Sequence, residues 1–96
     1  MTDRNEYLPV PLGRTVATPG ALAALEQAGE SPTTYLDRHA AGDWGDVGTE
    51  DYQENELSLD KELRLFSVYH TRCGDTLWVI TEADRSATTI LMPAEY

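Results

Sequence analysis

The sequence predicts one α+β domain in which an N-terminal short strand and two to three short helices pack on a C-terminal three-stranded antiparallel β-meander. Two helix-start signals, Thr18-Pro19 and Ser31-Pro32, stand in the N-terminal half. From Leu63 onward, apolar and polar residues alternate with a period of two, which is typical of strands. A length of 96 residues fits one domain. We therefore expect 1–11 to be a flexible leader and 12–96 to be a single domain.

The helices are predicted from their start and stop residues. Thr or Ser before Pro favours an N-cap followed by the first helical position, and a Gly after the last turn favours a stop. Thr49 followed by Glu50 and Asp51 is typical of a further helix start, because the helix dipole favours acids in the first turn. These signals predict a strand over 12–17 and helices over 20–28, 32–41 and 50–59.

The C-terminal third predicts strands over 63–72, 76–82 and 87–92. With Cys73-Gly74 as a two-residue loop, Tyr69 sits opposite Trp78, and with 83–86 as the second loop, Trp78 sits opposite Leu91. Both sheet faces are then largely apolar, whereas a small antiparallel sheet normally exposes one face to water. Two explanations stay open: the helices cover both faces, or a homodimer forms through one sheet face.

The net charge is −10, from 17 acidic and 7 basic residues. The stretch 43–62 holds eight acids and one lysine, so it carries −7 of this charge and leaves −3 for the rest. Direct nucleic-acid binding is disfavoured, because it needs clustered Lys and Arg. An acidic surface instead suits high solubility or a protein partner with a basic cleft. The acidic stretch is therefore interpreted either as a mimic of nucleic-acid phosphates or as a solvated helix face.

Several function classes are disfavoured by what the sequence lacks. The single cysteine, Cys73, permits no intramolecular disulfide, which fits a reducing compartment. No stretch approaches the roughly 20 apolar residues of a membrane span, and the polar start resembles no secretion signal, so a cytoplasmic location is expected. No glycine-rich phosphate loop, G-x-S-x-G or dinucleotide fingerprint is present, and no cofactor is expected.

Three groups of residues are candidate sites. Trp44 lies between two Asp and two Gly, which suits either an exposed contact or a core side chain after a helix stop. The histidines, His39 and His70, could serve a metal site or an enzyme, but no ligand spacing such as HxH or CxxC occurs, and packing is favoured. In the turn 82–86, a Glu could act as a base and an Arg could hold an anion, although a solvated turn is the ordinary interpretation. The candidate partner-binding residues are Asp43, Trp44, Asp46, Glu50, Asp51, Glu54, Glu56, Glu82, Asp84 and Arg85.

Four stretches carry a resemblance to a known family: 12–22 (LGRTVATPGAL), 38–45 (RHAAGDWG), 54–56 (ENE) and 78–86 (WVITEADRS). Together they resemble a family of small, roughly 100-residue bacterial proteins of unknown function, carried on plasmids and integrated elements. Members are often labelled plasmid-related or type I restriction-associated. The restriction label does not fit this chain, because a methyltransferase needs a cofactor-binding α/β domain that 96 residues cannot hold. The resemblance implies a mobile-element setting, in which small acidic inhibitors of host defence are common.

Three functions are therefore considered, in this order. The first is an acidic binding protein that inhibits a host defence or basic nucleic-acid-binding protein by protein–protein contact. The second is an accessory homodimeric protein without catalytic activity. The third is a small hydrolase or nuclease that uses histidine with Glu82, Asp84 and Arg85, and it requires a cleft shared by those groups.

Overall fold

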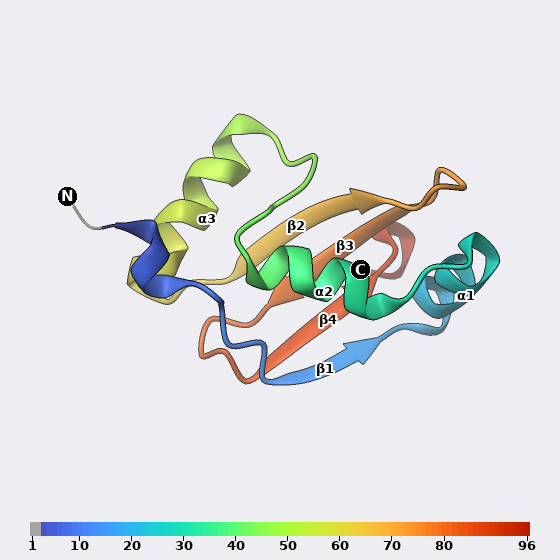
Figure 1. Ribbon diagram of the computed structural model, residues 1–96, viewed down its shortest axis with the longest axis horizontal. Helices are drawn as coiled ribbons and strands as arrows, with labels where there is room; N and C mark the ends of the chain where they lie inside the picture. Colours follow the sequence, from blue (N-terminus) through green and yellow to red (C-terminus); the bar gives the residue numbers. More distant parts are fainter. Residues whose placement is uncertain (1–2) are drawn as a thin grey trace.

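The computed structural model describes residues 3–96 and has an α+β fold, as predicted. Its sheet has four strands in the order β1-β4-β3-β2, with three helices between β1 and β2 in the chain (Figure 1). The elements are η1 (Arg4–Tyr7), β1 (Arg14–Ala17), α1 (Pro19–Ala28), α2 (Pro32–Ala40), α3 (Thr49–Lys61), β2 (Leu65–His70), β3 (Thr76–Thr81), β4 (Ala87–Leu91) and η2 (Pro93–Glu95).

The predicted three-stranded antiparallel sheet is wrong in one respect. β3 is antiparallel to both of its neighbours, β2 and β4, but β1 joins the sheet in parallel beside β4. Gly13 permits this join because its φ of 64° turns the chain into β1, where a Cβ would overlap the backbone of Ser86. The backbone of Arg14 then donates to the carbonyl of Ser86 at 2.9 Å. The sheet is therefore mixed.

The helix starts follow the predicted signals. The Thr18 hydroxyl accepts from the amide of Ala21 and the Ser31 hydroxyl from that of Thr33, each before a proline in the first turn. α1 ends at Gly29, which has a left-handed φ of 67°. α3 begins after Gly48 without a side-chain cap and places two acids in its first turn.

The main core lies between one sheet face and the helices α1 and α2. That face is formed by alternate residues of three strands, all buried, and α2 crosses it (Figure 1). α3 instead stands beside the outer edge of β2, over a second buried cluster. The side chains of the covered face are Leu65, Ser67, Tyr69, Leu77, Val79, Thr81, Thr88 and Ile90.

The predicted β3–β4 register is confirmed, with Trp78 opposite Leu91. The predicted β2–β3 register is wrong by one residue, because Tyr69 lies opposite Leu77. The connection is a longer loop over 71–75 rather than a two-residue turn, and it is closed by hydrogen bonds between Thr71 and Asp75. A slip of one residue moves every β2 side chain to the other face relative to β3.

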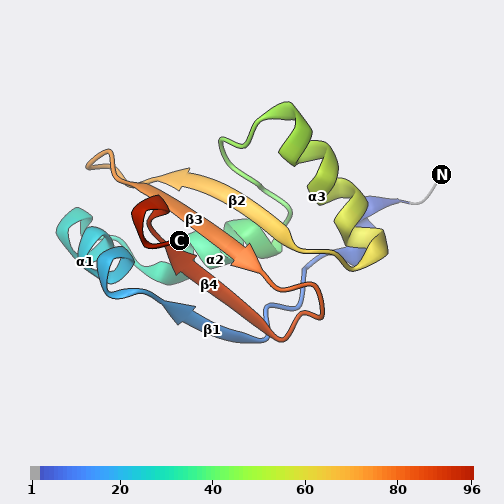
Figure 2. The same cartoon turned by 180° about the vertical axis from the view of Figure 1, so that it is seen from behind.

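The second sheet face is covered in part by the C-terminal end of the chain. η2 and Tyr96 lie over this face in the view from behind (Figure 2), and the Trp78 and Tyr96 rings meet edge to face at 5.6 Å. Ile80 and Leu91 are only 6% exposed beneath them. The helices therefore do not cover both faces as the first explanation required, because only η2 and Tyr96 lie over this one, and most of its strand residues stay partly exposed. The expected homodimer through this face stays a prediction.

The stretch expected as a loose leader makes specific contacts where the structure describes it. Val10 is 4% exposed, and its amide donates to the carbonyl of Ala40 at 2.8 Å. Arg4 forms an ion pair of 2.9 Å with Glu56 on α3. Residues 3–11 thus pack against α2 and α3, while 1–2 lie outside the described residues.

Candidate functional site

Most of the candidate acidic side chains are engaged by neighbours within the chain. Asp43 pairs with Arg38 at 2.7 Å, and this hydrogen bond holds the pKa of Asp43 below its ordinary value. Asp46 lies 3.1 Å from His70. Three further acids are held elsewhere: Glu56 by Arg4 and the Trp44 indole, Glu82 by Arg64, and Asp84 by the amide of Ser86.

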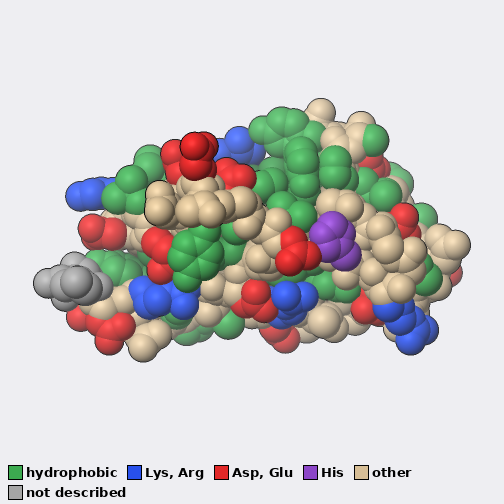
Figure 3. Space-filling view, turned by 90° about the horizontal axis from the view of Figure 1, so that it is seen from above, with side chains coloured by type: hydrophobic (Ala, Val, Ile, Leu, Met, Phe, Trp, Pro, Cys, Tyr) green, Lys and Arg blue, Asp and Glu red, His purple; other side chains and the backbone are tan. Residues whose placement is uncertain are grey.

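The acids without such a partner lie on the N-terminal half of α3. Glu50, Asp51 and Glu54 are exposed, and within residues 3–96 no ion pair joins them to a cation. In the view toward α3 and the β2 edge (Figure 3), acidic side chains are spread among basic and neutral ones rather than gathered in one block. The candidate residues therefore do not form one continuous acidic surface.

Trp44 belongs to the interior rather than to a contact surface. Its side chain is 2% exposed, and the indole N–H donates to Glu56 Oε2 at 2.8 Å. The ring meets the His39 imidazole edge to face at 5.6 Å. The core interpretation of this residue holds, so Trp44 lies outside the surface that a partner could contact in this structure.

Arg85 braces its turn through bonds to backbone carbonyls. Its guanidinium donates to the carbonyls of Leu63 at 2.7 Å and Ser58 at 2.8 Å, and also to two carbonyls of its own turn. These bonds tie the turn between β3 and β4 to the C-terminal end of α3. Burial lowers the pKa of Arg85 from its ordinary value. Both Nη atoms of Arg85 are thus engaged by backbone carbonyls of the chain.

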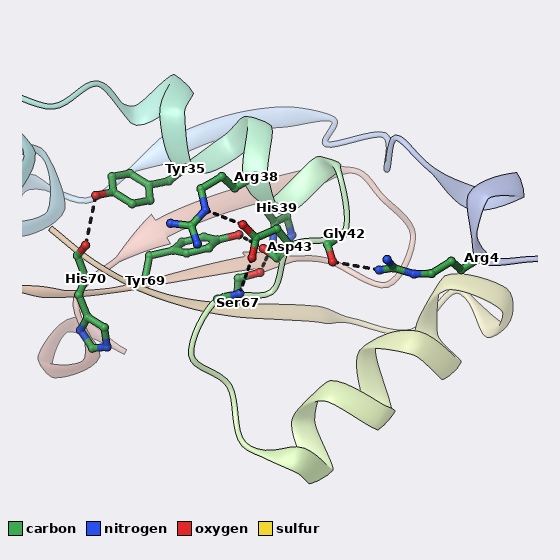
Figure 4. A network of polar contacts seen from close by, with 10 residues as sticks. Arg4, Tyr35, Arg38, His39, Gly42, Asp43, Ser67, Tyr69 and His70 are labelled. Atoms are coloured by element: carbon green, nitrogen blue, oxygen red, sulfur yellow. Dashed lines mark hydrogen bonds and ion pairs between the residues drawn. The ribbon is translucent and has the colours of Figure 1, made fainter.

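His39, in the last turn of α2, points its side chain toward the sheet and takes part in a buried chain of hydrogen bonds (Figure 4). Its Nδ1 is 2.6 Å from Ser67 Oγ, and its Nε2 is 2.8 Å from Thr81 Oγ1. Thr81 Oγ1 is 2.8 Å from Thr88 Oγ1, which donates to the carbonyl of Leu12. Because Thr88 uses its only proton there, Thr81 donates to Thr88, and His39 Nε2–H donates to Thr81. Ser67 then donates to Nδ1, and the tautomer of His39 is fixed.

Ser67 and His39 are in hydrogen-bond contact, as a nucleophile and its general base would be. However, both side chains are buried, so a substrate could not reach them. His39, Ser67 and Thr81 are 0% exposed. Burial lowers the pKa of His39 to about 4, so the ring is neutral near pH 7. The chain of bonds satisfies buried polar groups and joins β2, β3 and β4 to the segment before β1.

The hydrolase hypothesis requires a cleft that a histidine shares with Glu82, Asp84 and Arg85. His70 and Glu82 do not share one. His70 pairs with Thr76 at the start of β3, whereas Glu82 follows the last residue of that strand, roughly 20 Å away along an extended chain. None of three well-formed grooves among the described residues is lined by a histidine. No group of three or more His, Cys, Asp or Glu side chains in that part of the chain could hold a metal ion.

The groove with the most aromatic lining lies between α3, the start of β2 and the second sheet face, and measures about 390 Å³. Phe66 and Trp78 meet edge to face at 5.2 Å in its wall, with Tyr96 on the other side of the indole. Asp51 and Glu54 line it from α3. Its lining residues are Asp51, Glu54, Arg64, Leu65, Phe66, Trp78, Ile80 and Tyr96.

Sequence reasoning missed this groove although it named two of its acids. The predicted register placed Phe66 and Trp78 on opposite faces, and the observed register brings them together. The usable signal was the apolar character of both faces together with an aromatic residue at the end of the sequence given.

Among residues 3–96 there is no helix long and apolar enough to cross a membrane. Cys73 is an exposed free thiol in the loop between β2 and β3. The chain matches no protein-family profile, no curated protein and no solved structure.

Proposed function

We propose that this chain is a small acidic binding protein that acts by protein–protein contact, with its contact site at the aromatic groove beside α3. The observation that carries the proposal is the combination of an apolar, aromatic wall with two unpaired carboxylates, Asp51 and Glu54, at one rim. Tyr96, at the other side, is 71% exposed.

This chemistry suits a partner segment that presents Lys or Arg beside an apolar side chain. The carboxylates attract the cation, and the aromatic rings accept both its apolar stem and its charge. The net charge of −10 adds a long-range attraction to a basic protein. A nucleic-acid-binding protein of host defence is the partner class that we propose, in line with the mobile-element setting that the sequence resemblance implies.

The proposal is tested by affinity capture from a host lysate at low and high salt, followed by variants. We expect a basic partner that is retained at low salt and lost at high salt. The Asp51→Asn/Glu54→Gln variant should weaken its binding by roughly tenfold or more. The matched control is Glu26→Gln/Asp37→Asn, which makes the same charge change on α1 and α2, away from the groove.

Equal binding by the two double variants would reject the groove as the site, because net charge alone would then explain the affinity. A Tyr96→Ala variant separates the apolar contribution, since Tyr96 is exposed and carries no charge there. We expect it to weaken binding without changing the dependence on salt. Retention of full affinity by Tyr96→Ala would contradict the role given to the aromatic wall.

A further inference from the structure

The outer edge of β1 has free backbone hydrogen-bonding groups. The amides of Arg14 and Thr18 donate to the carbonyls of Ser86 and Ile90, so the backbone groups of these two residues face β4. Because successive residues of a strand point their backbone groups to opposite sides, those of Thr15 and Ala17 face away from β4. No hydrogen bond of the described residues 3–96 reaches them from this outer side. Nothing lies beyond β1 in Figures 1 and 2.

The segment around this edge also differs in charge from the rest of the chain. Between Glu6 and Glu26 the only charged side chain is Arg14. Val16 is 38% exposed on the same face as Arg14. In a chain of net charge −10, this is the stretch where a second copy could approach with the least repulsion.

We propose that β1 pairs in an antiparallel manner with β1 of a second copy, about a two-fold axis that passes through Val16. Such an axis places residues of the same face opposite one another. Thr15 then lies opposite Ala17 of the second copy, and the two exchange both backbone hydrogen bonds. Val16 lies opposite Val16 of the second copy in a pair without backbone bonds, where side chains are closest.

The neighbouring registers are poorer. An axis through Thr15 would need Gly13 in the ladder, and its φ of 64° takes it out of the extended conformation. An axis through Ala17 would place Pro19 opposite Thr15, and proline has no amide hydrogen to donate. The axis through Val16 uses only residues of β1 that already have outward-facing groups.

This register also brings opposite charges together. Arg14 lies opposite Thr18 of the second copy. Within each chain the Thr18 hydroxyl donates to the Glu95 carboxylate, which also accepts from the amides of Gly20 and Met92. Arg14 of one copy therefore approaches Glu95 of the other, once on each side of the axis. This complementarity and the self-matching register favour a second copy over an unrelated strand.

Register-specific crosslinking tests the pairing. In a Cys73→Ser background, which removes the only native thiol, we expect Val16→Cys to form a disulfide-linked dimer on mild oxidation. Directly opposite residues without backbone bonds lie about 4.5 Å apart between Cα atoms, within the range of a disulfide. Thr15→Cys is the matched control, because its equivalent in the second copy lies on a diagonal at roughly 7–8 Å. Equal crosslinking of the two variants, or none by Val16→Cys, would overturn the proposal.

Sedimentation of the uncrosslinked protein provides the second test. We expect a monomer–dimer equilibrium across the micromolar range, weakened roughly tenfold or more by Arg14→Glu, which removes the attraction to Glu95 and adds repulsion. The control is Arg72→Glu, which makes the same charge change in the loop between β2 and β3. A strict monomer at all concentrations would overturn the pairing, as would equal weakening by both variants.

Discussion

The two edges of the sheet are treated in opposite ways. At the β2 edge each outward-facing residue has at least one bonded backbone group: the Asn55 amide bonds both backbone groups of Phe66, and the backbone of the loop 44–46 bonds Val68. The carbonyl of His70 accepts from the Tyr35 hydroxyl. At the β1 edge the corresponding groups are open.

This difference indicates at which edge the sheet can add a strand from another chain. An exposed strand edge pairs readily with another chain, and proteins protect edges that they do not use. Here the protection of β2 comes from three separate elements, α2, the loop before α3, and α3 itself. A chain that closes one edge so fully and leaves the other open has one edge suited to a partner.

The largest expected effect comes from opening the closed edge at Gly45. This residue has a φ of 71° and forms the bridge to Val68, and a Cβ there would overlap the Val68 carbonyl oxygen. We expect Gly45→Ala to lower the free energy of unfolding by at least about 4 kcal/mol, because left-handed strain adds to the lost pairing. Urea unfolding measures it.

The control for this prediction is Gly74→Ala in the loop between β2 and β3. Gly74 also has a positive φ, of 92°, but a Cβ there meets nothing within 4 Å. We expect a loss of about 1–2 kcal/mol from backbone strain alone. Equal losses for the two variants would show that the bridge to β2 contributes nothing.

We expect an effect of intermediate size on the free energy of unfolding when the pH is lowered. The residue responsible is His39, whose chain of hydrogen bonds connects β2 with the segment before β1. Its pKa is lowered from 6.5 to about 4 by burial. The unfolded chain therefore binds the proton more tightly, and the native state loses stability as pH falls below 6.5. We expect a loss of about 3 kcal/mol by pH 4, at 1.36 kcal/mol for each pH unit.

The measurement is urea unfolding at a series of pH values, together with an NMR titration of the histidine rings. Between pH 6.5 and 5 the loss should be about 2 kcal/mol. Asp43 and the other acids with lowered pKa values act at lower pH, and the NMR titration distinguishes the His39 ring from that of His70. A His39 ring that titrates near 6.5 would contradict the neutral, buried state.

The elements of this fold were predictable where the signal is local. Proline after Thr18 and Ser31, with glycine after the last turn of α1, marks helix ends through backbone chemistry that any context preserves. The pairing of β1 with β4 joins residues 73 positions apart in the sequence and leaves no local signature. The β2–β3 register failed because the loop over 71–75 is closed by the Thr71 side chain, which a two-residue turn pattern does not describe.

The candidate site was predictable only in part for the same reason. The sequence pointed to Asp51 and Glu54 through their charge, but it could not pair Asp43 with Arg38 or place Arg85 under α3. Those contacts depend on tertiary geometry. The aromatic wall followed from the β2–β3 register, so the error in the sheet became an error in the site.

The smallest expected effect concerns Asn55, which closes the β2 edge from α3. Its side chain is 2% exposed and bonds the Phe66 carbonyl at 2.6 Å and the Phe66 amide at 3.0 Å. We expect Asn55→Ala to lower the free energy of unfolding by about 2 kcal/mol, because both backbone groups lose their partner. Asn55→Asp should cost at least as much, since it places a buried carboxylate oxygen against the Phe66 carbonyl in place of a donor. Thr15→Ala, at the open edge, should cost less than about 0.5 kcal/mol in the monomer. A cost for Thr15→Ala as large as that for Asn55→Ala would mean that the two edges are equally engaged, and the asymmetry on which the β1 pairing rests would be lost.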